Sequence, residues 1–171
     1  SHPFVYKNWL FAHNGSVDRE FLLTLLSDEY KRAIKGETDS EIYFYWLLQN
    51  IAECRGNIIF AIERVLKGIM PRPHTGLNFL LSDGQRLYAF RYSKRSKDYY
   101  SLYKLDRKSA ESSPKELLSP NTNLLFRNKS AAQEKAVLLC SEKLTSENWQ
   151  EIKNGQILMI RLDLQVITSE I

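Results

Sequence analysis

Two kinds of apolar periodicity follow one another along this chain, and their order limits its possible folds more than any other feature of the sequence. Between residues 18 and 69, apolar residues recur every three to four positions. Beyond residue 76 they form short runs separated by turn residues, which is typical of strands. Because the two patterns are segregated along the chain, the sequence predicts an α+β fold. The helical spacing predicts three consecutive helices, over 18–34, from Thr38 to near Gly56, and from Asn57 to about Gly68.

Short apolar runs predict one strand before the helices, over 4–12, and several after them. Asp83-Gly84 and Asn154-Gly155 lie between such runs, and Asp-Gly and Asn-Gly pairs favour tight hairpin turns. We therefore expect 77–81 to pair with 86–92, and 149–152 to pair with 157–162. Further expectations are strands over 99–105, 136–140 and 164–168, a loop over 70–76, and a surface loop or short helix over 106–123.

Polar residues precede the predicted helices at positions where their side chains can cap them. Ser16 or Asp18 could cap the first helix. Thr38 and Glu41 have the spacing of a capping box, in which the glutamate reaches back to the backbone of the capping residue. Asp39 is then the first helical residue, where the helix dipole stabilises a charged carboxylate.

Length and composition fit a single globular domain. The chain has 171 residues, of which 43% are hydrophobic and 26% charged, and these values are ordinary for a folded domain. No apolar run approaches the ~20 residues that a membrane-spanning helix needs, so we expect no membrane partner. Two cysteines far apart in sequence, Cys54 and Cys140, predict reduced thiols in the core of a cytoplasmic protein.

Basic residues alternate with tyrosines between Arg91 and Lys108. This stretch accounts for much of the net charge of +4. Basic residues among aromatic ones can form a nucleic-acid surface. No nucleic-acid-binding motif accompanies them, so we expect a solvated hairpin whose tyrosines pack inward, and no nucleic-acid partner.

Two short polar motifs lie at the ends of predicted elements. His13-Asn14-Gly15 is expected to end the first strand in a turn, and Gly36-Glu37-Thr38-Asp39-Ser40-Glu41 opens the second helix. With His2-Pro3-Phe4 and Asn8-Trp9-Leu10-Phe11-Ala12 before them, these motifs resemble those of the class II glutamine amidotransferases, and most closely the small stand-alone branch. Residues 78–84, 141–145 and Trp149 also fit, so the resemblance spans most of the chain.

The resemblance implies the fold of an N-terminal-nucleophile hydrolase, a four-layer αββα sandwich with two antiparallel sheets between helical layers. The family's nucleophile is a cysteine at the mature N-terminus, followed by an arginine-bearing strand that grips the substrate carboxylate. Here Ser1 precedes a His-Pro segment that lies well downstream of that cysteine in the family. We therefore expect residues 1–171 to be the C-terminal two-thirds of one glutamine amidotransferase type-2 domain, without its nucleophile and without part of one sheet.

Amide hydrolysis of glutamine passes through a tetrahedral oxyanion that needs hydrogen-bond donors. The side chain of Asn14 and the backbone N–H of Gly15 can converge on one oxygen, and the resemblance assigns the oxyanion hole to them. It also assigns the α-ammonium group of glutamine to Asp39, through a charge-assisted hydrogen bond. The alternatives are that Asn14-Gly15 only makes a turn, and that Asp39 serves only the helix dipole.

Thr38 and His13 complete the predicted substrate-binding group. Thr38 should hold Asp39 in place as the helix cap. His13 should support the site without being its base, because in the family the base is the nucleophile's own α-amino group. No histidine or cysteine has a partner at metal-ligand spacing, so no metal and no cofactor is implied.

The predicted function is hydrolysis of the glutamine side-chain amide through a cysteine thioester, with release of ammonia. The expected partners are L-glutamine or a γ-glutamyl compound, together with an N-terminal segment or a protein that accepts the ammonia. Two alternatives stay open. One is hydrolysis of γ-glutamyl amides in a larger thiol or peptide substrate, and the other is a non-catalytic binding or scaffold module of the same fold.

Overall fold

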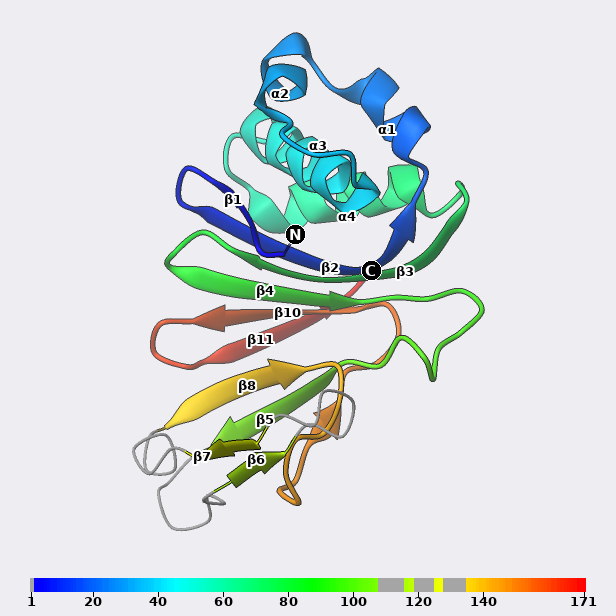
Figure 1. Cartoon of the computed structure of the whole chain (residues 1–171). Coiled ribbons are helices and arrows are strands. Elements are labelled where there is room, and N and C mark those ends of the chain that lie inside the picture. The colour runs from blue at the N-terminus through cyan, green and yellow to red at the C-terminus, as the bar shows by residue number, and fades with distance from the viewer. Residues whose placement is uncertain (1, 108–115, 119–124, 128–134) are drawn as a thin grey trace.

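A helical layer and three antiparallel sheets, of six, three and two strands, form the structure, a computed structural model that describes residues 2–107, 116–118, 125–127 and 135–171 (Figure 1). The helices are α1 (Arg19–Leu25), α2 (Asp28–Ala33), α3 (Asp39–Glu53) and α4 (Ile58–Ile69). The large sheet contains, in spatial order, β1 (Phe4–Tyr6), β2 (Trp9–Val17), β3 (His74–Ser82), β4 (Arg86–Arg91), β10 (Gln156–Arg161) and β11 (Val166–Glu170). The small sheet has the order β8 (Ala136–Cys140), β5 (Tyr103–Arg107), β9 (Gln150–Glu151), and β6 (Glu116–Leu118) pairs with β7 (Leu125–Arg127).

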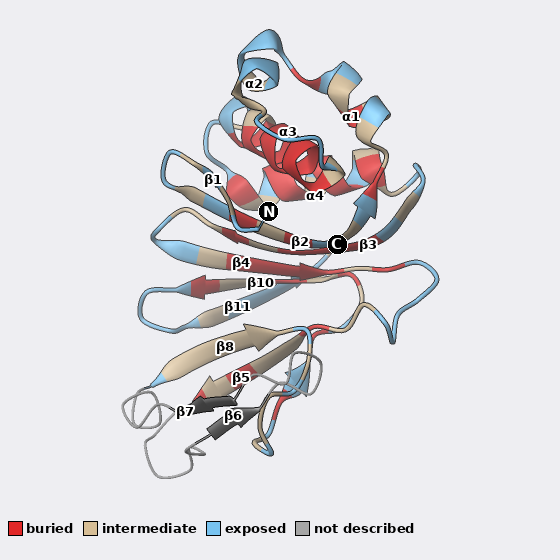
Figure 2. Ribbon diagram, viewed as in Figure 1, coloured by how far each residue is buried: buried red, intermediate tan, exposed pale blue. Residues whose placement is uncertain are grey.

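Helix α3 lies at the centre of the helical layer. Most of its side chains are buried, because it packs against β2 and against the three other helices (Figure 2). Phe11 of β2 stacks on Phe44 of α3 with ring centroids 5.3 Å apart, and Tyr43 meets Phe11 edge-on at 5.4 Å. This aromatic packing holds the second turn of α3 against β2.

A second apolar cluster joins the two sheets. Its buried members are Ala89, Leu102, Ile152, Leu158 and Ile160. Side chains alternate between the two faces of a strand. Phe11, His13 and Phe79 face the helices. Their neighbours along β2 and β3 therefore face the small sheet, namely Ala12, Asn14, Asn78 and Leu80.

The structure confirms a mixed fold of segregated helices and antiparallel sheets. One helical layer, the large and small sheets and the β6–β7 pair are present in the described ranges, and the second helical layer of a four-layer sandwich stays a prediction. No helix of the described residues combines the length and the apolar composition needed to cross a membrane.

The prediction of one strand over 4–12 that ends at His13-Asn14-Gly15 was wrong. Residues 4–6 and 9–17 form two strands of a hairpin, and β2 continues through the motif to Val17. Asn14 pairs with Asn78 and Gly15 with Leu77, and a β-bulge follows Gly15. The Asn-Gly pair therefore lies where β2 pairs with β3, and it does not form the turn that we expected.

The single helix expected over 18–34 is divided into α1 and α2. Leu26 and Ser27 have extended backbone, and the amide of Gln49 on α3 supports the break. Its oxygen accepts from the N–H of Ser27 at 2.9 Å, and its nitrogen donates to the carbonyl of Leu25 at 3.2 Å. A tertiary contact thus satisfies backbone groups that a continuous helix would have paired internally.

Other predictions differ in their outcomes. The structure confirms the hairpin of β3 and β4 and the strand over 136–140. It shifts two other boundaries: β3 begins inside the loop expected over 70–76, and the strand expected over 99–105 is Tyr103–Arg107. Gly155 has a φ of 85°, as expected of a turn residue. The predicted pairing of 149–152 with 157–162 was wrong, because β9 pairs with β5, and β10 pairs with β4 and β11. Within 106–123, residues 116–118 form a strand, and 108–115 and 119–123 lie outside the described residues.

Candidate functional site

His13 joins the two sequence motifs in the folded chain. Its Nδ1 atom lies 2.9 Å from the hydroxyl of Ser40, and its Nε2 atom lies 3.1 Å from the carbonyl oxygen of Gly76. Because a carbonyl only accepts, Nε2 carries the proton and Nδ1 accepts from the hydroxyl of Ser40. Burial lowers the pKa of His13 to about 4, and the Gly76 carbonyl and the charge of Asp39 oppose this effect only in part. His13 is therefore neutral near pH 7, with both ring nitrogens engaged.

The carboxylate of Asp39 links the first turn of α3 to the end of β2. Oδ2 accepts from the N–H of Val17 at 2.8 Å, and Oδ1 accepts from the N–H of Ser40 at 2.8 Å. Asp39 remains partly exposed. A carboxylate has about four acceptor positions, so these bonds leave room for an ammonium donor.

Thr38 and Glu41 order the chain before α3. The hydroxyl of Thr38 accepts from the N–H of Glu41 at 3.3 Å, which confirms this half of the predicted capping box. The carboxylate of Glu41 accepts instead from the N–H groups of Lys35 and Gly36, at 2.9 and 2.7 Å. Glu41 thus fixes the approach to the helix and not the backbone of its cap.

Gly15 permits an unusually close approach of β2 and β3. Its φ is 142°, and a Cβ atom placed there would lie 1.8 Å from the carbonyl oxygen of Gly76. That carbonyl is the one that accepts from His13. Glycine is therefore required at this position by the fold itself, in addition to any role in an oxyanion hole.

Asn14 lies where two cavities meet between the sheets. One cavity, of about 310 Å³, is also lined by Ala12, His13, Leu139 and Cys140. The second, of about 570 Å³, has Asn14, Ser101 and Ser141 in common with the first and is also lined by Asp98, Tyr99, Tyr103, Glu142 and Lys143. We call these the inner cavity and the outer cavity.

The predicted site residues are brought to one end of β2, but on different faces of it. Asn14 lines both cavities, whereas Asp39 and Thr38 line neither. His2 also lines the inner cavity, where partial burial lowers its pKa and the charge of Asp39 opposes this decrease.

Sequence reasoning gave no role to Asn78, which organises one wall of the inner cavity. Its Nδ2 donates to the carbonyls of Tyr100 at 3.1 Å and Ser101 at 3.3 Å, and its Oδ1 accepts from the N–H of Tyr92 at 3.0 Å. The available signal was a polar residue within the apolar run 77–81. A buried polar side chain in a strand needs partners, and here it ties the loop after β4 to β3.

Cys140 was expected in the core, but it is half-buried and lines the inner cavity. Burial raises the pKa of its thiol, with the charge of Glu142 as a smaller contribution. A thiol with a raised pKa is a weak nucleophile at neutral pH. Within the described ranges, no cluster of three or more His, Cys, Asp or Glu side chains could hold a metal ion.

Comparison with known proteins identifies the family. The sequence model of the class II glutamine amidotransferases matches residues 1–170. The chain belongs to the class II glutamine amidotransferases. It is similar to a protein of Haemophilus influenzae named as a candidate glutamine amidotransferase, with 25% identity over 177 residues that cover 94% of this chain and 54% of the relative.

Solved structures of the family have the same fold. A glutamine aminotransferase class-II domain protein from Silicibacter pomeroyi is 28% identical, with a TM-score of 0.65 over 99% of this chain and 70% of that chain. A predicted glutamine amidotransferase from Pseudomonas aeruginosa gives a TM-score of 0.69 at 22% identity, over 99% of this chain and 65% of that one. The chain thus spans about half the length of the Haemophilus relative and about two-thirds of these structures.

Proposed function

We propose that this chain forms the glutamine-binding part of an enzyme that hydrolyses the side-chain amide of glutamine and releases ammonia. The supporting observation is that His13 and Asp39 join the two family motifs at one end of β2, beside a cavity lined by Asn14. The proposal includes a cytoplasmic location, a four-layer sandwich in the complete domain and a catalytic cysteine outside these 171 residues.

In the proposed reaction, the cysteine thiolate attacks the carbonyl carbon of the glutamine amide. The Asn14 side chain and the Gly15 N–H donate to the oxygen that becomes negative in the tetrahedral intermediate. Asp39 pairs with the α-ammonium group and so fixes the amino-acid end of the substrate. The α-amino group of the cysteine, which took the thiol proton, returns it to the nitrogen, which leaves as ammonia, and water then hydrolyses the thioester to glutamate and the free thiol.

Asp39 and Thr38 act together in this proposal. The Thr38 cap and the bonds from Val17 and Ser40 hold the Asp39 carboxylate in one orientation. A side chain held by such bonds loses little further freedom when the ligand binds, which favours affinity. His13 supports the same residues through Ser40 and supplies no proton, since it is neutral and already paired.

Calorimetric titration with L-glutamine tests the proposal. The wild-type chain should bind glutamine more tightly than glutaramate, which lacks the α-ammonium group. Asp39→Asn should remove this preference and weaken glutamine binding about tenfold, the effect of losing a charge-assisted hydrogen bond of ~1.4 kcal/mol. Asp28→Asn is the matched control, because Asp28 is also the first residue of its helix, and it should change nothing. Absence of glutamine binding by the wild-type chain would refute the proposal.

The two alternative functions are separated by turnover. A segment that carries an N-terminal cysteine, added to the chain, should restore release of ammonia from glutamine if the enzyme proposal is correct. Preferential cleavage of larger γ-glutamyl amides would favour the first alternative. Glutamine binding without any turnover in the presence of that segment would favour the non-catalytic module.

A further inference from the structure

A third cavity lies between the segment that leads into β3 and the loop that follows β4. Its volume is about 730 Å³. That is within the range of ~300–1,000 Å³ typical of small-molecule sites. It is lined by residues 70–75, residues 93–96, Tyr99 and Tyr100. Asn14, Gly15 and Asp39 do not line it, so the proposed glutamine site does not account for its composition.

Among the described lining residues, three carry a positive charge, and we call this space the basic cavity. Arg72 comes from one wall, and Lys94 and Arg95 come from the other. No carboxylate of the described residues forms an ion pair with any of the three. Asp98, the acidic residue of the same loop, lines the outer cavity instead. Cations of one sign around a concave surface attract an anionic ligand.

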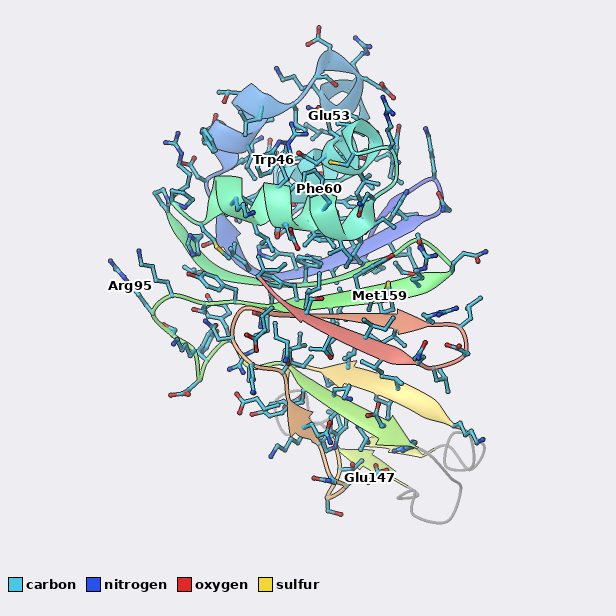
Figure 3. The ribbon with its side chains drawn as sticks, turned by 180° about the vertical axis from the view of Figure 1, so that it is seen from behind. Trp46, Glu53, Phe60, Arg95, Glu147 and Met159 are labelled. Atoms are coloured by element: carbon cyan, nitrogen blue, oxygen red, sulfur yellow. The ribbon has the colours of Figure 1, made fainter. Side chains whose placement is uncertain are left out.

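The cations are presented in two different ways. The guanidinium of Arg72 lies over the ring of Phe21, 3.8 Å from its centroid, and this contact restricts its position. The stacking uses the face of the guanidinium, whereas phosphate oxygens accept from the N–H groups at its edge. Lys94 and Arg95 are exposed, and Figure 3 shows Arg95 extending outward from its loop.

Tyr99 adds an exposed aromatic ring to the same cavity. We expected the tyrosines of this stretch to pack inward, and this was wrong for Tyr99, which is 77% exposed. Its ring meets that of Tyr100 edge-on, with centroids 4.9 Å apart. Tyr100 in turn packs on Gly76, where a Cβ atom would lie 2.3 Å from its ring. Tyr99 is therefore oriented by a packed neighbour, and an exposed ring beside cations suits the stacking of a nucleobase.

The wall that carries Lys94 and Arg95 is held in place by buried groups. Arg91 donates from Nη2 to the carbonyl of Lys97 at 2.8 Å and from Nε to the carbonyl of Tyr100 at 3.0 Å. The N–H of Ser93 donates to Oδ1 of Asn154 at 2.8 Å. Because the loop is fixed before a ligand arrives, little ordering is needed on binding.

We propose that the basic cavity is a second ligand site, which binds a nucleoside phosphate. The phosphate chain pairs with Lys94, Arg95 and Arg72, and the base stacks on Tyr99. A phosphate chain fits these cations better than a single carboxylate does, because it carries several charges and can bridge groups on two walls. The inference goes beyond the proposed function and does not rest on it, because glutamine hydrolysis needs no such ligand.

Three probes separate the two parts of the proposed site: ATP, inorganic triphosphate and adenosine, titrated by calorimetry without Mg²⁺. ATP should bind about five- to tenfold more tightly than triphosphate, the lower end of the range for a base stacked on an aromatic side chain. Adenosine should bind at least about tenfold more weakly than ATP, because it lacks the groups that pair with the cations.

Two double variants locate the phosphate contacts. Lys94→Gln with Arg95→Gln should weaken the binding of ATP and of triphosphate by about tenfold, because two charge-assisted contacts are lost. It should leave the affinity for L-glutamine unchanged. Lys31→Gln with Arg32→Gln removes the same charges from an exposed part of α2 and should leave both affinities as they are.

Tyr99→Leu tests the base contact separately. It should reduce the affinity for ATP to that for triphosphate and leave the affinity for triphosphate unchanged. A misfolded variant would lose both ligands, so this result would distinguish a lost stacking contact from a damaged fold.

The contrary outcomes are specific. Equal affinities of the wild-type chain for ATP and triphosphate would overturn the inference, and so would equal losses in the two double variants. A single-stranded oligonucleotide that binds more than tenfold tighter than ATP, and is lost in the Lys94→Gln, Arg95→Gln variant, would assign the surface to nucleic acid and also overturn it. A wild-type chain that binds ATP as expected but not L-glutamine would support the inference and refute the proposed function.

Discussion

At Gly15 the absence of a side chain lets β2 and β3 approach within contact distance at the centre of the candidate site. The nearest group is the Gly76 carbonyl, which also accepts from His13. Gly76 is itself covered by Tyr100, since a Cβ at Gly76 would lie 2.3 Å from Cδ1 of that ring. Backbone and ring are stacked here without spare room, so the position of the Gly15 N–H is set by its neighbours.

Gly15→Ala should therefore destabilise the protein by about 2–4 kcal/mol, the range for overpacking combined with backbone strain. Gly84→Ala is the matched control, because Gly84 also has a positive φ, at 82°, but has open space around it. Gly84→Ala should lower the free energy of unfolding by only ~1–2 kcal/mol, the cost of placing an L-residue in the left-handed conformation. Urea unfolding measures both, and equal losses would show that the contact with Gly76 is unimportant.

His13 makes stability depend on pH. Its pKa is about 4 in the folded protein and 6.5 when unperturbed, because burial disfavours the charged ring. Between these pH values the unfolded chain therefore binds a proton more readily than the folded protein does. The full free energy of unfolding is present above pH 6.5, and it decreases as the pH falls toward 4. Unfolding free energy should fall by about 2 kcal/mol from His13 between pH 7.5 and pH 5. His13→Gln should show a shallower pH dependence by this amount, and an unchanged slope would contradict the prediction.

The residues of the site were predictable from sequence where they belong to local motifs. Thr38 and Asp39 occupy the capping positions that their spacing predicted, because a helix start depends on neighbouring residues alone. Asn78 and Tyr100 could not be assigned in this way. Their contacts depend on which strands pair and on where the loop after β4 folds back, and neither is encoded by spacing along the chain.

At the scale of elements, the same distinction separates the predictions that the structure confirms from those that it revises. Asn57 caps α4 as expected, and its apolar stripe is buried. The break between α1 and α2 depends on Gln49 of a later helix, and the pairing of β9 with β5 depends on residues 46 or more positions apart. Local signals therefore fixed helix starts, while long-range contacts decided strand partners.

Arg91 is the residue on which the loop between β4 and β5 most depends. Besides Lys97 and Tyr100, it donates to the carbonyl of Ile152 and pairs with Glu151 at 2.7 Å. It therefore joins the loop to β9 of the small sheet.

Arg91→Gln should destabilise the protein by about 2–3 kcal/mol, because buried carbonyls lose their donor. Hydrogen exchange should accelerate at the N–H of Tyr100, which bonds to the carbonyl of Ser96, before it changes in α3. The control is Arg86→Gln, because Arg86 lies on the same strand at an exposed position. It should leave hydrogen exchange in the loop unaltered. Uniform acceleration throughout the chain would show that Arg91 supports the whole fold and not this loop.

At the scale of the whole molecule, two separate apolar layers meet at the large sheet. One lies under the helices and the other joins the sheets, and the inner cavity opens beside the second. Ala12 and Leu80 on the large sheet face Leu139 and Cys140 on the small sheet across this cavity. The shape of the site therefore depends on how the two sheets are held together.

Leu158→Ala tests this dependence at a residue that does not line the cavity. Leu158 is 3% exposed and belongs to the layer between the sheets. Its truncation should cost about 2–5 kcal/mol and accelerate hydrogen exchange in β5 and β8 more than in α3. Glutamine affinity should also fall, because the walls of the inner cavity lose their common support.

Two controls separate this effect from general destabilisation. Leu162→Ala changes the same residue type at a position that is 74% exposed, and it should change stability by less than about 0.5 kcal/mol. Ile62→Ala removes a fully buried side chain on the helical side and should cost a similar amount to Leu158→Ala. It should accelerate exchange in α4 before β8, because the helical layer loosens without separating the sheets. If both core variants instead released β5, β8 and α4 together, the two layers would form one cooperative unit, and the small sheet could not open independently to admit a ligand.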